Sequence, residues 1–229
     1  MADDQDSREK YFDKDEYFVG SASNYSRLPG GYNFLRRGLF WKGKINRIAK
    51  YMPAGRVLDI GCAYGYFLYF FKKRHYDIYG CDISPHAITT CKGLFKKSCS
   101  DHFFTHDITK PLPFPEEYFD VITCQDVIEH IPDIFPPLKN IYAALKPGGI
   151  FFLRIPIKTK YHATEILRFE RDPTHISVLP EAILMKNVLA VGFTLLEKHY
   201  TWMGAIRLPS FIKFGSDIAM ILQKPKSAG

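Results

Sequence analysis

The stretch Val57-Leu-Asp-Ile-Gly-Cys-Ala-Tyr-Gly-Tyr-Phe-Leu68 passes from an apolar strand through a glycine turn into an apolar helix. Small residues at the turn leave the backbone open to close approach by a ligand. The first amide groups of a helix have no partner within the helix, so we expect them to face that ligand. The stretch therefore predicts a βα unit with a ligand site at its turn.

Asp59 lies where this first strand ends, which places a carboxylate beside the predicted ligand. A carboxylate at that position repels a pyrophosphate group and attracts the ammonium group of an amino acid. The turn therefore differs in its electrostatics from the glycine loops that bind dinucleotides.

Strand and helix patterns alternate along the rest of the chain. We expect strands at residues 56–60, 77–83, 102–108, 119–124, 150–155, 194–201 and 216–223. We expect helices at residues 39–49, 65–74, 85–96, 135–145 and 180–191. Repeated βα units predict a doubly wound parallel α/β sheet, whose ligands bind at the carboxyl ends of the strands.

The 229-residue chain has 46% hydrophobic residues, which suits one α/β domain with an appended segment. We expect residues 1–53 to form an N-terminal arm and lid, and residues 54–229 to form the ligand-binding domain. No apolar run reaches the roughly 18 residues that a membrane span requires. Residues 1–10 are charged, unlike a signal peptide, and the five cysteines include no C-x-x-C pair. These features predict a cytoplasmic protein with reduced thiols.

Polar side chains end three later strands of the predicted sheet. Asp82 ends the second strand, roughly 20 residues beyond the glycine turn, where an acid accepts hydrogen bonds from ribose hydroxyls. Asp107 ends the third strand, and Gln125 follows the fourth. Because carboxyl ends of parallel strands share one edge of the sheet, we expect these side chains to line one site.

Two further motifs are Phe119-Asp-Val-Ile-Thr-Cys-Gln-Asp-Val-Ile-Glu-His-Ile131 and Leu145-Lys-Pro-Gly-Gly-Ile-Phe-Phe-Leu153. With the glycine turn, they resemble the class I S-adenosylmethionine-dependent methyltransferases, over about residues 55–224. The resemblance is to the small-molecule type, including the quinone-biosynthesis methyltransferases. It implies a Rossmann-like seven-stranded sheet of order 3-2-1-4-5-7-6 with the last strand antiparallel. One departure is Ala63, which replaces the middle glycine of the family's D-x-G-x-G-x-G pattern.

By this resemblance the cofactor is S-adenosyl-L-methionine. The cofactor-binding residues that it implies are Asp59, Gly61, Cys62, Ala63, Gly65, Asp82, Ile83, Asp107, Ile108, Gln125 and Tyr25. Residues 59–63 would lie along the methionine part, and Asp82 would accept from the ribose. Asp107 would accept from the adenine amino group, and Gln125 would turn its carbonyl toward the methionine amine. Tyr25, in an aromatic arm similar to the lids of some small-molecule methyltransferases, could reach the methionine carboxylate.

Two histidines are candidates for a catalytic base. His175 lies on the loop after the fifth strand, where the family covers its acceptor pocket, and Asp172 could orient it. His130 follows the fourth strand. Each could instead tie a loop in place.

Asp126, Glu129 and His130 share a helical face and resemble a metal-binding pair of acids and histidine in quinone-biosynthesis O-methyltransferases. No further ligand is evident in the sequence, so we predict no metal site.

The expected reaction is methyl transfer to oxygen, nitrogen or carbon of a small molecule, which an apolar loop at residues 202–214 suggests is aromatic or lipid-like. That loop could wall the acceptor pocket, join two subunits of a homodimer, or touch a membrane surface. A monomer is equally compatible.

A net charge of +7 leaves RNA as a rival acceptor, with protein as another, but the basic residues are scattered and favour no nucleic-acid partner. A methyltransferase-like fold that binds cofactor without catalysis is the non-enzymatic alternative.

Overall fold

The computed structural model describes residues 11–13, 34–95, 99–158, 174–202, 206–207 and 217–226. Tyr25, Asp172 and most of the 202–214 loop lie outside these described residues. Predictions made for them therefore stay predictions.

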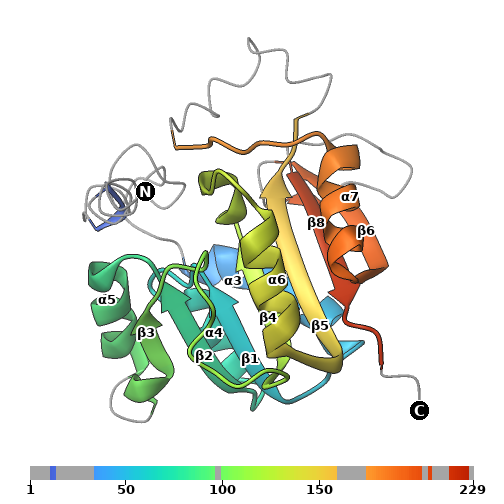
Figure 1. Cartoon of the computed structure of the whole chain (residues 1–229). Helices are drawn as coiled ribbons and strands as arrows, with labels where there is room; N and C mark the ends of the chain where they lie inside the picture. Colours follow the sequence, from blue (N-terminus) through green and yellow to red (C-terminus); the bar gives the residue numbers. More distant parts are fainter. Residues whose placement is uncertain are drawn as a thin grey trace.

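A single mixed sheet runs through the described part of the chain, with strand order β3-β2-β1-β4-β5-β8-β6-β7 (Figure 1). The strands are β1 (Arg56–Ile60), β2 (Asp77–Asp82), β3 (Phe103–Thr105), β4 (Phe119–Gln125), β5 (Leu145–Pro156), β6 (Thr194–Trp202), β7 (Ile206–Arg207) and β8 (Asp217–Gln223). Strands β1 to β5 pair in parallel, whereas β8 is antiparallel to both β5 and β6. With the two-residue β7 set aside at the edge, this confirms the predicted order 3-2-1-4-5-7-6.

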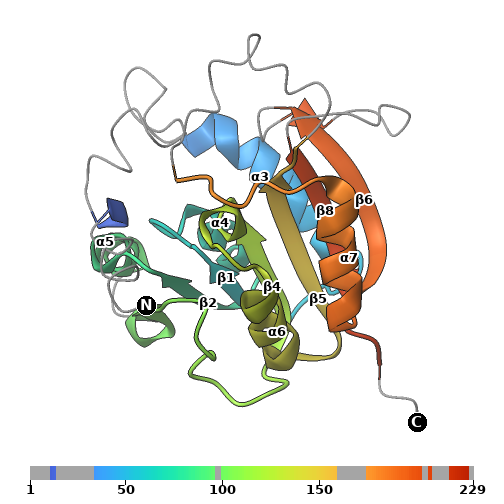
Figure 2. The same ribbon diagram turned by 45° about the horizontal axis from the view of Figure 1, so that its top comes forward.

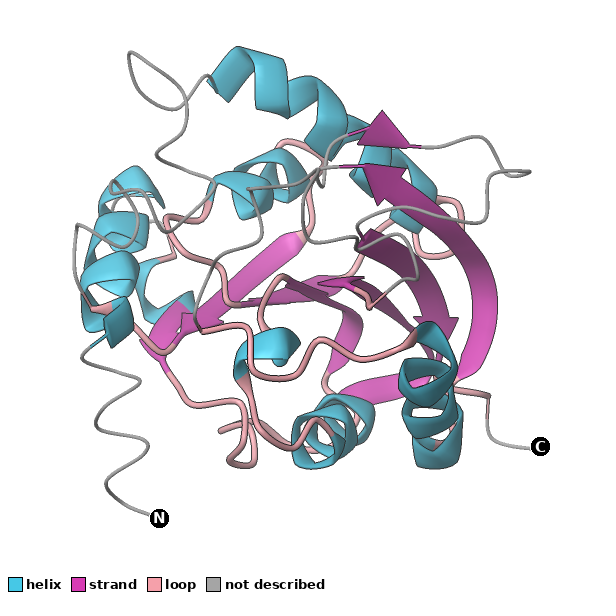
Figure 3. Ribbon diagram, turned by 90° about the horizontal axis from the view of Figure 1, so that it is seen from above, coloured by secondary structure: helices cyan, strands magenta, loops and turns pink. Residues whose placement is uncertain are grey.

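Helices cover both faces of the sheet, as a doubly wound fold requires (Figures 2 and 3). They are α3 (Phe34–Ala49), α4 (Tyr66–Lys72), α5 (Pro85–Phe95), α6 (Phe135–Ala144) and α7 (Glu181–Val191), with short 3-10 turns η2 (Ser100–His102) and η3 (Ile128–His130). Buried side chains of α3, α4 and α5 pack on one face, and those of α6 and α7 pack on the other.

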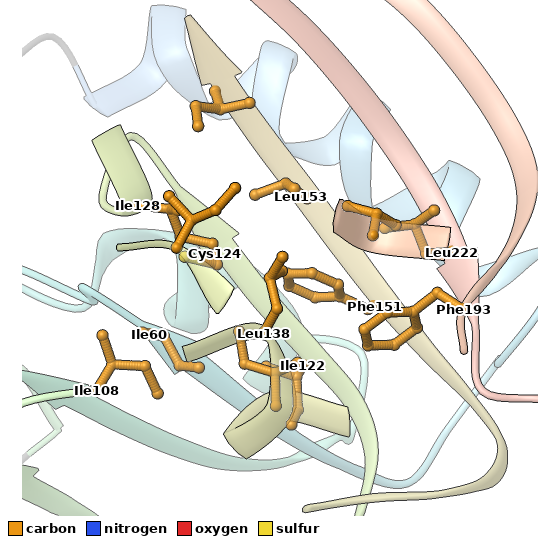
Figure 4. Close-up of a cluster of buried hydrophobic side chains, with 14 of the residues drawn as sticks. Ile60, Ile108, Ile122, Cys124, Ile128, Leu138, Phe151, Leu153, Phe193 and Leu222 are labelled. Carbon is orange, nitrogen blue, oxygen red and sulfur yellow. The ribbon is translucent and has the colours of Figure 1, made fainter. Parts of the chain in front are cut away.

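The core on the α6 and α7 side is a continuous layer of branched and aromatic side chains (Figure 4). Ile122 of β4 and Phe151 of β5 are fully buried between Leu138 of α6 and Phe193, which precedes β6. This packing fixes the positions of β4 and β5, and so of the residues at their carboxyl ends.

Three boundaries expected from the sequence were wrong by three or more residues. The first helix begins at Phe34 and not at residue 39, and β5 begins at Leu145 and not at residue 150. The third strand ends at Thr105, three residues earlier than expected, because the chain turns after His106 and Lys110 N bonds back to Asp107 O at 2.9 Å. Asp107 therefore lies in a turn beyond β3 and not on the strand itself.

The glycine turn between β1 and α4 uses left-handed backbone conformations. Gly61 has φ 69°, Ala63 φ 46° and Gly65 φ 75°. A Cβ atom on Gly61 would lie 2.1 Å from Cγ2 of Val127, and one on Gly65 would lie 2.5 Å from Sγ of Cys91. The two glycines are thus required by conformation and by space, whereas Ala63 accepts the left-handed cost of about 1 kcal/mol.

Four amide groups within this turn bind the protein itself, whereas the expectation of amides facing a ligand concerns the start of α4 at Tyr66 and stays a prediction. Gly61 N and Cys62 N both donate to Cys81 O, at 2.8 and 3.0 Å, and Gly65 N donates to Cys62 O at 2.8 Å. Ala63 N donates to the Asp82 side chain. The turn is therefore held tightly against the end of β2.

Gly61→Ala is predicted to lower the free energy of unfolding by about 2 to 4 kcal/mol, because the new methyl overlaps Val127 and φ stays left-handed. The control is Gly93→Ala in α5, where nothing lies within 4 Å of the added Cβ. It should be neutral or raise stability by up to about 1 kcal/mol. Urea unfolding measures both variants, and equal effects would contradict the packing role of Gly61.

Candidate active site

Asp82 joins the ends of β1 and β2. Its Oδ2 accepts from Ala63 N at 2.9 Å and its Oδ1 from Ser84 N at 3.0 Å. Burial raises the pKa of this carboxyl, and hydrogen bonds from the backbone amides of Ser84, Ala63 and Ile83 oppose that rise. Each carboxylate oxygen has a second lone pair, so Asp82 can still accept from hydroxyl groups of a ligand.

Asp59 is buried at the end of β1. Thr123 Oγ1, on the neighbouring strand β4, donates to Asp59 Oδ1 at 2.5 Å. Burial raises the pKa of Asp59 to about 7, while the hydrogen bond from Thr123 lowers it, Asp82 raises it and Lys44 lowers it. Near neutral pH this carboxyl therefore exists in both protonation states, and a cationic ligand group would favour the ionised one.

Gln125 and Lys44 meet beside these acids. Lys44 Nζ, from α3, donates to Gln125 Oε1 at 2.8 Å. Gln125 was predicted to turn this carbonyl toward a ligand amine, and in the structure the carbonyl oxygen binds Lys44. Sequence reasoning missed Lys44, because a lysine in an amphipathic helix before the sheet reads as a solvated residue.

The three residues expected to bind adenine, Asp107, Ile108 and Ile83, make separate contacts after β2 and β3. Asp107 Oδ1 accepts from Thr109 N at 2.9 Å within the turn after β3. Ile108 is buried in the core beside that turn, and its carbonyl accepts from Asn140 Nδ2 at 2.9 Å. Ile83 is half-buried directly after Asp82. All three lie at the carboxyl ends of β2 and β3.

A buried ionic group lies at the ends of β4, β5 and β8. Arg154 of β5 donates to the Asp126 carboxylate, and its second nitrogen lies 3.4 Å from Asp217 Oδ1. Burial raises the pKa of Asp126, and Arg154 opposes the rise. Arg154 could have been noticed in the sequence, because it is the one charged residue within the apolar run 150–155. Its partners could not be predicted, because they lie at the ends of other strands.

The two candidate bases lie together. The rings of His130 and His175 are 4.8 Å apart, edge to face, and His130 Nδ1 lies 3.1 Å from Thr174 O. Glu129 is fully buried, with Oε1 4.0 Å from His175 Nε2, and burial raises its pKa well above the usual range. The amides of Ile176 and Ser177 donate to Glu129 O at 3.0 and 2.9 Å, so the segment before α7 lies beside η3, just after the end of β4.

Among the described residues, three side chains form one cluster that could hold a divalent cation. Ligand atoms of Glu129, His130 and His175 all lie within 4.8 Å of one another. Asp126, which the sequence grouped with Glu129 and His130, is instead bound by Arg154. The third potential ligand, His175, comes from a distant loop, which is why the sequence did not reveal it.

Residues 11–13 lie across the same edge of the sheet. Asp13 Oδ1 accepts from Ser84 Oγ at 3.1 Å and from His86 N at 2.8 Å, just after β2. The ring of Phe12 lies 5.3 Å from that of His130, just after β4. This short segment therefore bridges the two ends of the candidate site.

The segment from α3 into β6 matches a protein-family model described as "Methyltransferase domain", over residues 34–198. The chain belongs to this methyltransferase family. Methyl transfer is the activity that this family assignment gives.

Curated relatives share this assignment. An uncharacterized methyltransferase, YcgJ of Bacillus subtilis, is 26% identical over 182 residues, which cover 76% of this chain and 70% of YcgJ. A ubiquinone biosynthesis O-methyltransferase of Coxiella burnetii is 31% identical over 96 residues, 42% of this chain and 41% of that protein. Phosphoethanolamine N-methyltransferase 3 of Arabidopsis thaliana is 29% identical over 143 residues, 62% of this chain and 29% of that protein. The match thus spans less than half of the two enzymes with named substrates.

Solved structures agree with the fold. A SAM-dependent methyltransferase from Archaeoglobus fulgidus superposes with a TM-score of 0.66 at 23% identity, over 93% of this methyltransferase and 99% of that chain. The structure of YcgJ gives a TM-score of 0.60 at 17% identity, over 82% and 99%. None of the helices in the described part of the chain has the length and apolar character needed to cross a membrane.

Asp59→Asn is predicted to stabilise the protein at pH 8 by on the order of 2 kcal/mol and to have little effect near pH 4. The folded-state pKa of about 7 lies above 3.8, the ordinary pKa of an aspartate, so the wild type loses stability as pH rises between these values. Asn can still accept from Thr123, whereas it carries no charge to bury. Urea unfolding of both proteins from pH 4 to pH 8 measures the difference, and a constant difference over this range would contradict a buried, titrating Asp59.

Proposed function

We propose that this methyltransferase binds S-adenosylmethionine across the carboxyl ends of β1, β2 and β4 and methylates a small molecule. The observation that carries the proposal is Asp82, whose carboxylate is fixed by Ala63 N and Ser84 N at the turn after β1. A fixed carboxylate with lone pairs to spare suits the two hydroxyls of a ribose.

The remaining candidates fit the other parts of the cofactor. The ammonium group of methionine would lower the pKa of Asp59 and favour its ionised form. Asp59 comes just before Gly61 to Ala63 in the chain. Asp107, Ile83 and Ile108 lie past β2 and β3, on the side proposed for adenine. Bound S-adenosylmethionine supplies an electrophilic methyl group, so alignment of the acceptor is the main task left to the protein.

The acceptor is proposed to lie near His130 and His175, at the end of β4. Relatives named for ubiquinone biosynthesis and for phosphoethanolamine both support a small-molecule acceptor. The buried group of Arg154, Asp126 and Asp217 adds fixed charges at this end of the sheet. His175 is proposed as the base that takes a proton from an oxygen or nitrogen acceptor, with His130 packed against it.

We propose that residues 1–53 form an arm and lid over the ligand-binding domain of residues 54–229. Residues 11–13 contact both the segment after β2 and His130 after β4, which suits the lid expected within residues 1–53. A lid in this position would exclude water from the bound cofactor.

Calorimetry with S-adenosylhomocysteine tests the cofactor site. Asp82→Asn, which keeps one acceptor oxygen, should bind about 10-fold or more weakly than wild type, because a charged partner of the ribose is lost. Asp101→Asn, in the exposed turn before β3, is the matched control and should bind like wild type. Failure of the wild type to bind would refute the proposed function, and wild-type affinity in Asp82→Asn would refute this site.

His175→Ala should lower the methyl-transfer rate about 100-fold with unchanged cofactor affinity, since a general base typically contributes on this order. The acceptor for this assay is first found by screening fractionated metabolite extracts with labelled S-adenosylmethionine. His75→Asn, an exposed site whose φ of 63° suits asparagine, is the control. A wild-type rate in His175→Ala would remove this residue from the chemistry.

A further inference from the structure

Glu129, in the turn η3 after β4, is a buried carboxyl whose place in the interior needs an explanation. Its exposed fraction is 0%, and neither of its carboxyl oxygens is hydrogen-bonded to another residue in the described part of the chain. A polar group buried without a partner is destabilising. Because Glu129 lies beside a candidate base, its role is to be sought in the chemistry of that base.

The imidazole of His175 faces this carboxyl. Glu129 Oε1 lies 4.0 Å from His175 Nε2. Glu129 O also accepts from Ile176 N at 3.0 Å and from Ser177 N at 2.9 Å. The same residue thus holds the backbone after His175 and presents a carboxyl to its ring. Contacts of this kind are often long before a substrate binds and shorten in the complex.

The two side chains differ in their access to solvent. That of His175 is 23% exposed, whereas that of Glu129 is 0% exposed. A ligand can therefore meet the imidazole, but the carboxyl acts on that ligand only through the ring. A base with another group behind it that orients the ring has this arrangement.

The charge on Glu129 depends on ionic groups at the ends of β4, β5 and β8. Burial raises the pKa of Glu129 well above its usual range, and the charge of Asp126 raises it further. The backbone amide of Glu129 and the charge of Arg154 lower this pKa, and Asp217 raises it. Because the pKa is raised on balance, the carboxyl is protonated in acid and ionises only as the pH rises beyond the usual range.

Two more titratable side chains adjoin the pair. The thiol of Cys124, in β4, stays uncharged, because burial and the charge of Glu129 raise its pKa well above the usual range. The ring of His130 lies 4.8 Å from that of His175 and brings no negative charge. Within the described residues, Glu129 is therefore the carboxyl that faces His175.

We propose that Glu129 is the positioning residue of His175: it holds the ring through Nε2 and, when ionised, balances the positive charge that the ring takes up from an acceptor. The inference rests on the role of base proposed for His175. The proton leaves an O–H or N–H bond of the acceptor for the imidazole, and the electron pair of that bond stays on the acceptor atom to bind the methyl group. The imidazolium then faces a carboxylate, which lowers the energy of this state. The pair returns the proton to water after the product leaves.

Modification with diethyl pyrocarbonate tests this contact without knowledge of the acceptor. A neutral ring nitrogen attacks a carbonyl carbon of the reagent and keeps the ethoxycarbonyl group, ethyl carbonate leaves, and the ring proton goes to water. Mass spectrometry of peptides then gives the rate at each histidine. At pH 8.5, His175 of Glu129→Gln should react about 10-fold more slowly than that of wild type, because the ring loses a charged partner. At pH 5.5 the two proteins should agree within about twofold, since the wild-type carboxyl is then uncharged like that of Gln.

Two controls accompany this measurement. Glu116→Gln, at an exposed site before β4, is the matched variant and should react as wild type at both pH values. The exposed His75 is the internal reference and should react at one rate in every protein.

A double-mutant cycle of methyl transfer tests whether Glu129 acts through His175. It uses labelled S-adenosylmethionine and the acceptor fraction found by the metabolite screen. Glu129→Gln should lower the rate about 10-fold in the wild-type background and less than about twofold in the His175→Ala background, because the partner of the carboxyl is then absent. Glu129→Asp, which keeps the charge on a shorter side chain, should restore part of the rate.

The outcomes separate the inference from the base on which it rests. If Glu129→Gln slows modification of His175 equally at both pH values, Glu129 only supports the packing of η3, and the inference is wrong. It is also wrong if Asp172→Asn slows modification and Glu129→Gln does not, or if millimolar Mg²⁺ or Mn²⁺ protects His175 in wild type alone. A wild-type transfer rate in His175→Ala, with the slowing at pH 8.5 still present in Glu129→Gln, would refute the base and leave the contact between the two residues.

Discussion

The candidate site depends on the Asp82 carboxylate, which binds the backbone on both sides of the point where β1 and β2 end. One oxygen fixes the turn after β1 through Ala63 N, and the other fixes the start of the next helical segment through Ser84 N. Gly61 and Cys62 add two hydrogen bonds to Cys81 O, so the turn is held along its length by the neighbouring strand. A ligand that approaches this edge meets a backbone already set in its shape, and little ordering is left for binding to provide.

The same edge carries an unusual density of buried charge. Asp59, Asp82, Asp126 and Glu129 all have raised pKa values because burial disfavours their ionised forms. Such groups reduce stability unless a partner compensates them, and the pKa of Asp126 stays raised although Arg154 lowers it. Retention of several acids at one end of a sheet is the usual cost of a site that must receive a cationic ligand. The proposed ligand carries both a sulfonium and an ammonium group, which this arrangement suits.

Much of the fold could be predicted from the sequence, because period and turn signals are local. The strand order of the family, the antiparallel β8 and the boundaries of β1 all agree with expectation. The carboxyl ends of β1, β2 and β4 were also correctly placed, since each is marked by a polar residue after an apolar run. Contacts between distant segments could not be predicted. Lys44 with Gln125, and His175 with Glu129, join residues 81 and 46 positions apart, and no spacing rule connects them. The acceptors of the Gly61, Cys62 and Ala63 amides lie on β2, and these contacts could not be predicted from the turn alone.

The most direct measurement of the central claim is a crystal structure of the protein with S-adenosylhomocysteine. The account predicts ribose hydroxyls within hydrogen-bond distance of Asp82, the amino-acid end beside Asp59 and Gln125, and residues 11–13 over the ligand. The ligand in another place, or a ribose that makes no contact with Asp82, would contradict the account.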